Sequence, residues 1–363
     1  MSSASTTVDP TAARGLAVDP VDQADDSIRA RIRADLPADT FTPRPWRVLL
    51  VVPFVAAAIA SMWTIIALDP PWYLSLVLAL VIGQCFASLG FLAHDAMHGG
   101  MVKSRRAQDV LGYIGFAPVL VSPTLWRTWH NQVHHNKTNA GNADPDSFGT
   151  LERYQRAPST RVVARLAPGS GHWYSAFFLG YWFTFHAQVV LWIQSKYLKT
   201  FKGLNRRRAI IDTFAFVAAW AVVAWLAGPV GAIFVIVVPL IVANATVMSY
   251  IATNHFMRPQ SASNDPLVNS MSVTSPKIVD LVHNNFSYHV EHHLFPRMSP
   301  SRAPRVRQWL KANEATRYVS PPHWLAVSYL YKTPRVYLDA TTLCDPDNPE
   351  RQMSTDDIAL ALS

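Results

Sequence analysis

Three short runs of histidine are the residues of this chain best suited to carry out chemistry. They read His94-Asp-Ala-Met-His98, His130-Asn-Gln-Val-His134-His135 and His289-Val-Glu-His292-His293, and they hold eight of the thirteen histidines. Residues three or four apart lie on one face of a helix, so each run can direct its imidazoles to one point. Imidazole binds iron, copper and zinc, and eight such ligands are too many for one ion. The spacing therefore predicts a site for two metal ions, which points to redox chemistry.

The elements that would position these runs are unusually apolar. Of the 363 residues, 50% are hydrophobic and 15% are charged, which is too apolar for an ordinary soluble enzyme. Four charge-poor stretches, at about 48–68, 72–93, 209–227 and 230–252, each approach the roughly 20 residues that cross a bilayer as a helix. Only Asp69-Pro70-Pro71 separates the first two, and only Gly228-Pro229 separates the last two. We expect an all-α integral membrane protein with four transmembrane helices in two hairpins and a cytoplasmic helical cap that holds the di-metal site.

The positive charges predict the orientation of this protein. The net charge is +8, and basic residues flank both hairpins, whereas the two hairpin turns carry no Lys or Arg. This pattern places both termini and all three histidine runs in the cytoplasm, and it needs no nucleic-acid partner. The apolar stretch 173–193 is expected not to cross, because a crossing would put the third run on the opposite side from the first two. We expect it to form an interfacial helix.

The chain divides accordingly into six segments. They are a polar N-terminal tail (1–45), a first transmembrane hairpin (46–95), a cytoplasmic catalytic region with the interfacial helix (96–208), a second hairpin (209–253), a second cytoplasmic catalytic region (254–345) and a loose C-terminal tail (346–363). A short amphipathic helix is expected near 26–36. Cys85 lies in a predicted span, far in sequence from Cys344, so no disulfide is expected between the two.

The histidine runs and their surroundings resemble the integral-membrane fatty acid desaturase and hydroxylase superfamily. Its boxes are H-x3/4-H, H-x2/3-HH and (H/Q)-x2/3-HH. The similarity extends to Asn136-Lys137-Thr138-Asn139 after the second box and to Leu294-Phe295-Pro296 after the third, and it covers roughly 46–310. The resemblance implies a centre of two iron ions, molecular oxygen as co-substrate, and a cis double bond introduced into a long acyl chain.

Five further residues are candidates near the boxes. Members of the superfamily often have an extra ligand after the fourth span, which makes His255, or alternatively Asn254 beside it, the best candidate for a ninth ligand. Asp95 and Glu291 are expected to orient imidazoles, because metal-bound imidazoles usually donate their second N–H to a carboxylate or carbonyl. His283 is expected to contact the ligands without binding a metal.

Other polar residues divide less clearly. Asp144 and Asp146 are equally compatible with orienting a metal ligand and with being solvated charges of a loop. His172, His186 and His323 are expected to be structural. The basic run from Arg297 to Lys311 is interpreted as ordinary cytoplasmic surface charge, although it could also receive a phosphate-bearing headgroup or an acidic electron donor.

The chain contains no haem, nucleotide or iron–sulfur motif that could deliver electrons. We therefore expect an external donor of the ferredoxin or cytochrome b5 type, with its reductase, and a lipid or acyl-thioester substrate. The alternatives are a carotenoid ketolase or hydroxylase and an acyl hydroxylase of the same superfamily. A metal transporter is more remote, because the apolar stretches hold no facing set of His, Asp or Glu. The position of the double bond and the acyl carrier stay open.

Overall fold

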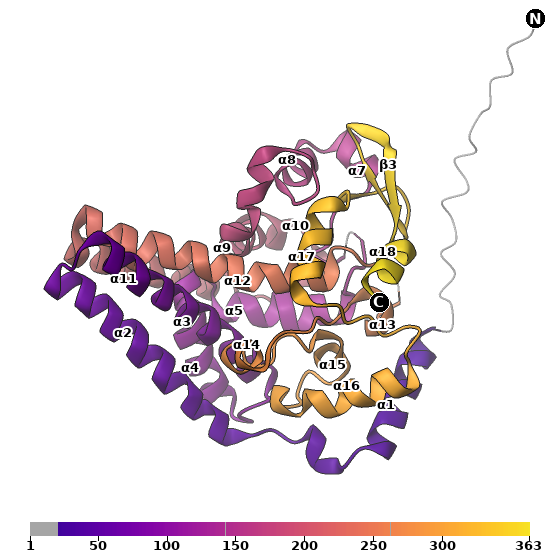
Figure 1. The fold of residues 1–363 in the computed structure, drawn as a ribbon, viewed down its shortest axis with the longest axis horizontal. Coiled ribbons are helices and arrows are strands. Elements are labelled where there is room, and N and C mark those ends of the chain that lie inside the picture. Colours follow the sequence, from indigo (N-terminus) through magenta and orange to yellow (C-terminus); the bar gives the residue numbers. More distant parts are fainter. Residues whose placement is uncertain (1–20, 142, 262) are drawn as a thin grey trace, which may run out of the picture.

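A computed structural model describes residues 21–141, 143–261 and 263–363 of the chain. The described part is mostly helical, as expected, with one small antiparallel sheet of three strands in the order β1-β2-β3. Figure 1 shows the long helices gathered at one end of the molecule, with the shorter helices and the sheet at the other. Residues 1–20 of the predicted N-terminal tail (1–45) lie outside the described residues.

Four long helices form the apolar end. They are α2 (Val51–Leu68), α3 (Trp72–His98), α11 (Arg206–Ala232) and α12 (Val238–His255), with a π-helical segment, η8 (Ile233–Val237), joining the last two. Between α2 and α3, Asp69 turns the chain with a φ of 41° before the two prolines. The first predicted hairpin is therefore present, and α3 continues past its apolar stretch to carry His94 and His98 on its last turns.

The second hairpin turns at Gly228. Its φ of 68° and ψ of 172° leave the helical region, which a glycine without a Cβ adopts easily, and Pro229 follows directly. Val217 and Trp220, before this break, line one cavity together with Ile236 and Leu240, after it. The chain therefore folds back on itself at the Gly-Pro pair that the sequence marks as a turn.

In the part of the chain that the structure describes, three helices are long and apolar enough to cross a membrane: Pro45–Leu68, Trp72–His98 and the interrupted Arg206–His255. Two bent pairs raise this number to five if each is counted as one span, namely Arg105–Val119 with Pro123–Lys137 and Trp173–Gly180 with Trp182–Tyr197. Large apolar side chains are exposed along the long helices, among them Ile59, Trp63 and Trp225. Such exposure over whole helices is typical of contact with lipid.

Short helical segments connect the two hairpins. They are α4 (Arg105–Phe116), η3 (Ala117–Val119), α5 (Pro123–Trp126), η4 (Arg127–His134), α6 (His135–Lys137), α7 (Leu151–Arg156), α8 (Pro158–Leu166), η5 (Trp173–Gly180), α9 (Trp182–Val189), η6 (Val190–Gln194), α10 (Ser195–Tyr197) and η7 (Lys199–Phe201). The predicted interfacial helix is η5 through α10, and it bends by 78° between Gly180 and Trp182. Phe178, Trp182 and Phe183 bury one side of it in the main core, and Trp173 is exposed on the other.

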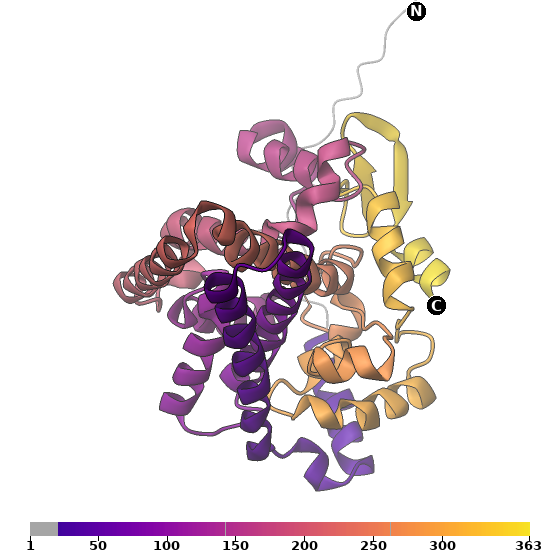
Figure 2. The ribbon, with the colours of Figure 1, turned by 60° about the vertical axis from the view of Figure 1, so that its left-hand side comes forward.

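The cap follows α12. It contains α13 (Pro266–Asn269), α14 (Lys277–Val282), α15 (His289–Leu294), η9 (Pro300–Arg302), α16 (Ala303–Asn313), α17 (His323–Lys332), β1 (Val336–Tyr337), β2 (Thr342–Asp345), β3 (Asn348–Ser354) and α18 (Thr355–Leu362). The sheet lies beside α7 and α8 in both views (Figures 1 and 2), and Thr150 forms a bridge to Tyr337.

The prediction of a loose C-terminal tail was wrong. Residues 348–354 add β3 to β2, and α18 buries Ile358 and Leu362 against the main core. The i, i+4 spacing of these two residues gives the short helix one apolar face, which is enough to fix it on an existing core. Cys344 lies buried in β2, and neither it nor Cys85 forms a disulfide, as expected.

The short helix expected near the N-terminus is confirmed as α1 (Val21–Asp35), which is followed by η1 (Ala38–Phe41) and η2 (Pro45–Leu50). Ile28 and Ile32 are buried against Trp309 and Leu310 of α16. Figure 1 shows α1 alongside α16, so this part of the predicted tail belongs to the cap.

Candidate metal centre

The second histidine box lies on a π-helix. Ser122 caps the preceding α5 by accepting hydrogen bonds from two backbone N–H groups, and the chain then continues into η4. The wider π turn lets residues five apart share a face, and the Nε2 atoms of His130 and His135 lie 3.1 Å apart. The His134 ring consequently points in a different direction from that of His135, so these two adjacent histidines belong to two different histidine groups.

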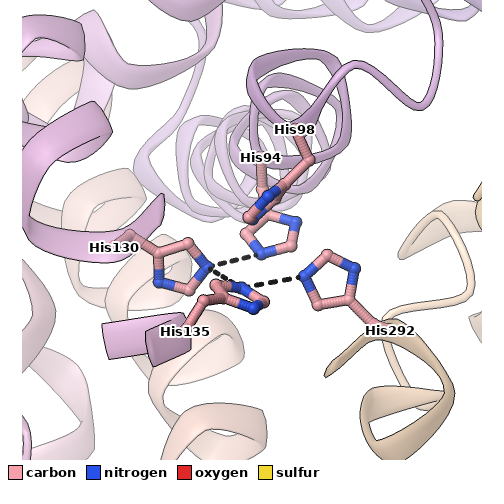
Figure 3. A group of neighbouring side chains, drawn as sticks. All are labelled: His94, His98, His130, His135 and His292. Atoms are coloured by element: carbon pink, nitrogen blue, oxygen red, sulfur yellow. Dashed lines mark hydrogen bonds between the residues drawn. The ribbon is translucent and has the colours of Figure 1, made fainter. Parts of the chain in front are cut away.

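The first group contains five imidazoles. They are His94, His98, His130, His135 and His292, contributed by α3, the second box and α15. Figure 3 shows these rings pointing to a common centre from three sides. Nε2 of His130 lies 2.9 Å from Nε2 of His94, and Nε2 of His135 lies 3.2 Å from Nε2 of His292.

The second group contains four imidazoles. His134, His255 and His293 offer ring nitrogens within 4.8 Å of one another. His289 joins them, because its Nε2 lies 2.6 Å from that of His255 and 3.0 Å from that of His293. All nine predicted ligands, His255 included, are therefore brought together, five in one group and four in the other.

The donor set fits two metal ions. Two nitrogens that bind one ion at about 2.1 Å lie roughly 3 Å apart when they are at right angles, which is close to the observed separations. The Nε2 atom of His98 is buried and has no hydrogen-bond partner among the described residues. Nitrogen lone pairs converging at such distances need a cation or proton between them, and imidazole is a ligand of iron, copper and zinc alike.

The two groups differ in exposure. His98, His135 and His292 of the first group are partly exposed. All four members of the second group are buried, with exposed fractions of 2–4%. The five-histidine group is therefore the outer one and the four-histidine group the inner one.

Burial controls the ionisation of the α15 imidazoles. It lowers the pKa of His289 and His293 well below the ordinary value, and neighbouring imidazoles add to the effect. Burial, followed by the nearby His134, lowers the pKa of His292 to about 3. These rings are held in the neutral form, whose lone pair binds a metal.

Two carboxylates after the second box orient His134. Its Nδ1 lies 3.1 Å from Oδ2 of Asp144 and 3.3 Å from Oδ2 of Asp146, which leaves Nε2 directed at the inner group. Asp146 also accepts hydrogen bonds from His186 at 2.9 Å and from Trp129 at 3.0 Å. His186, expected to be structural, thus supports the candidate ligand His134 through Asp146.

Asn139, the last residue of the motif after the second box, joins the two halves of the site. Its φ of 53° is left-handed, a conformation that asparagine tolerates. Its backbone N–H donates to Asp144 at 2.9 Å, and its side-chain amide donates to the carbonyl oxygen of His255 at 2.9 Å. The second box and α12 are fixed relative to each other through this residue.

Among the described residues Glu291 forms no hydrogen bond to an imidazole, and its side chain instead anchors α15. It is fully buried, and its carboxylate accepts hydrogen bonds from Arg307 at 2.9 Å, Ser272 at 2.6 Å and Tyr318 at 2.5 Å. Burial and the Glu291 charge raise the pKa of Tyr318 well above its ordinary value, so the phenol stays protonated and donates. The interpretation of Arg307 as surface charge was wrong, because this residue is 8% exposed and paired with Glu291.

Asp95, Asn254 and His283 lie near the centre without a hydrogen bond to a ligand ring among the described residues. The Asp95 carboxylate is buried and faces the Arg47 charge. Asn254 is fully buried, and its amide has no partner within the described residues. His283 bonds through Nδ1 to the Tyr250 hydroxyl at 2.9 Å.

Two cavities extend from the histidines into the apolar end. The tryptophan-lined cavity is bounded by Trp126, Trp129 and Trp182 together with candidate ligand histidines. The phenylalanine-lined cavity is bounded by Phe91, Phe116 and other apolar side chains, with His94 at its edge. Walls of this kind, apolar and aromatic with a few polar groups, suit an apolar ligand such as an alkyl chain.

Fold and site define a class of helical protein with membrane-type hairpins and two buried histidine groups suited to metal ions. The sequence profile of the fatty acid desaturase family matches residues 70–325. The chain therefore belongs to the fatty acid desaturase family, as its histidine boxes predict.

Several curated relatives support this assignment at low identity. The chloroplastic omega-6 fatty acid desaturase of Spinacia oleracea is 23% identical over 283 residues, which cover 74% of this chain and 60% of the relative. The sn-1 oleoyl-lipid 12-desaturase of Synechocystis sp. is 25% identical and covers 62% of this chain and 64% of the relative. The sn-1 acyl-lipid omega-3 desaturase (ferredoxin) of the same organism is 32% identical over 32% of this chain and 31% of its own length. This chain thus spans less than two thirds of the length of each.

Proposed function

We propose that the chain is a membrane di-iron fatty acid desaturase that uses O2 and two external electrons to introduce a cis double bond into a long acyl chain. The observation that carries the proposal is the convergence of nine imidazoles, in groups of five and four, beside apolar cavities. Membership of the desaturase family supports the same reaction. The ligands would be His94, His98, His130, His135 and His292 for one ion and His134, His255, His289 and His293 for the other.

The reaction balances with an external donor. A –CH2–CH2– unit, one O2, two electrons and two protons give –CH=CH– and two water molecules. When bound, two iron ions would supply, with O2, the oxidising power needed at an unactivated methylene, which is beyond any side chain acting alone.

The side chains have defined tasks around that chemistry. Asp144 and Asp146 hold the His134 ring in one orientation, and the Glu291–Arg307 pair fixes the helix that carries three ligands. The aromatic walls of the cavities exclude water and hold an alkyl chain against the histidines, which is a positioning effect.

Partners and location form part of the same proposal. The printed name of the Synechocystis omega-3 relative includes ferredoxin, which supports an external carrier of the ferredoxin or cytochrome b5 type. The names of the two Synechocystis relatives also refer to acyl chains on lipids, which supports a lipid-linked substrate. The helices able to cross a bilayer and their flanking basic residues support an integral membrane protein with termini and histidines on the cytoplasmic side.

Expression in a host with a matching carrier and reductase tests the proposal. Fatty acid methyl esters analysed by gas chromatography and mass spectrometry should contain a new cis-unsaturated chain, and the purified protein should contain two iron ions per chain. A variant with His130→Ala should lose the product. Unchanged fatty acid profiles in cells with active redox partners would refute the assignment as an acyl desaturase. If carotenoids in the same cells gain oxygen, the ketolase reaction becomes the assignment instead.

A further inference from the structure

A third cavity meets the histidines from the side of the cap. Unlike the phenylalanine-lined cavity, it has many polar groups in its wall, among them Asp95, Asn284 and Asn285. We call it the polar cavity. It reaches His94, His289 and His292, so it touches both histidine groups.

The Phe286 side chain lies where the three cavities meet, while Phe91 and His94 also lie between the polar and phenylalanine-lined cavities. Among the described residues Phe286 is the only one that lines all three. Its ring centroid lies 5.1 Å from that of His94 and 5.8 Å from that of His289, and it stacks on Phe91 at 4.4 Å. The ring thus stands beside one ligand of each histidine group, where the polar and apolar cavities meet.

The preceding turn fixes the ring in this place. Asn284 and Asn285 both have left-handed backbone conformations, with φ of 56° and 57°, which turn the chain between α14 and α15. The Asn284 side chain accepts a hydrogen bond from Arg47 and donates to the carbonyl oxygen of Phe91 at 3.4 Å. A non-glycine residue with positive φ is uncommon, and two in succession persist only where the surroundings hold them.

We infer that Phe286 is the partition that sets where an acyl chain is oxidised, an inference that rests on the proposed desaturase function. The polar cavity takes the ester or thioester end of the substrate, and the apolar cavities take its hydrocarbon end. A chain that joins them has to pass on the histidine side of the Phe286 ring. The ring therefore presses one segment of the chain against the ligands, and the length of the polar cavity sets the number of carbons before that segment.

Phe286→Ala tests this through the product. The wild-type enzyme should make one double-bond position, whereas the variant should make several, since the chain gains lateral freedom. A displacement of a reacting carbon by about 1 Å can change its rate of oxidation ~100-fold. We therefore expect the products with the double bond at other positions to rise ~10-fold or more relative to the main product. Phe286→Leu, which removes less side-chain volume, should give an intermediate distribution of double-bond positions. It replaces the alanine variant in the test if that variant folds poorly.

Phe116→Ala is the matched control. Phe116 is also a buried phenylalanine, but it lines only the phenylalanine-lined cavity. Its truncation should lengthen the chains accepted while the double bond stays at the same distance from the carboxyl end. A single product isomer from Phe286→Ala, with wild-type regioselectivity, would overturn the inference.

A second measurement needs neither metal nor turnover. Val247 lines the phenylalanine-lined cavity and does not line the polar one. In purified protein with Cys85 and Cys344 replaced by alanine, Val247→Cys should react slowly with a charged methanethiosulfonate. Adding Phe286→Ala should accelerate labelling ~10-fold or more, equivalent to about 1.4 kcal/mol of barrier, whereas adding Phe116→Ala should not.

The two measurements separate the possible failures. Equal labelling rates with and without Phe286 would show that the ring is no partition, whatever the enzyme catalyses. Faster labelling in Phe286→Ala, together with a wild-type protein that makes no unsaturated acyl chain, would retain the partition and refute the proposed substrate.

Discussion

Replacing Arg307 by leucine should destabilise the cap and loosen the helix that carries three of the nine histidines. Arg307 donates to Glu291 at 2.9 Å and to the backbone carbonyl of Ser287 at 2.9 Å, and its guanidinium lies 3.7 Å above the Tyr288 ring. Because the Glu291 side chain is fully buried, the substitution leaves a carboxylate that is out of water and without a counter-charge. Removing one partner of such a pair costs about 3–5 kcal/mol.

The assay is thermal unfolding of purified protein in detergent at a fixed scan rate. For a protein of this size, that cost should lower the apparent midpoint by roughly 4–7 °C, and bound iron should fall as α15 loosens. Glu291→Gln combined with Arg307→Leu removes both charges and keeps an acceptor for Tyr318, so it should recover part of the loss. A single variant as stable as the wild type, or a double variant no better than the single one, would refute the reasoning.

Three further outcomes are expected. Asp144→Asn should weaken iron binding ~10–100-fold, since it removes a carboxylate that orients His134, as measured by titration of iron into the metal-free protein. His255→Ala should lower the iron content from two per chain towards one in elemental analysis, whereas His323→Ala, outside both histidine groups, should leave it at two. Cysteines introduced at Pro71 and at Gly228 should both react with an impermeant reagent from the side of the membrane opposite to the histidines, and reaction from the same side would contradict the two-hairpin topology.

Ligand positions were predictable from the sequence because they depend on short spacing. His94 and His98 share a face of any helix, and the same rule applies to His289 and His293. His255 was predicted as a ligand from its position directly after an apolar stretch. The π-helical turn that sends His134 and His135 to different groups was not predictable, since spacing alone assigns no π geometry.

Contacts between distant segments escaped prediction for a different reason. Asp146 and His186 are 40 residues apart, and Arg307 reaches Glu291 across a loop, so no local pattern marks either pair. The Asp144-Pro145-Asp146 spacing shortly after the second box was the one available signal for the carboxylates. The burial of Leu362 likewise depends on a core that only the folded chain provides.

The unequal exposure of the two histidine groups bears on how the centre is assembled. His98, His135 and His292 border the surface, whereas the inner four histidines are shielded by the rest of the fold. A chelator should therefore strip the outer position first, in a biphasic release whose fast phase accounts for half of the metal. The inner position should then exchange only when α12 or α15 opens, so that a protein carrying different metals at the two positions can be prepared by timed chelation and refilling.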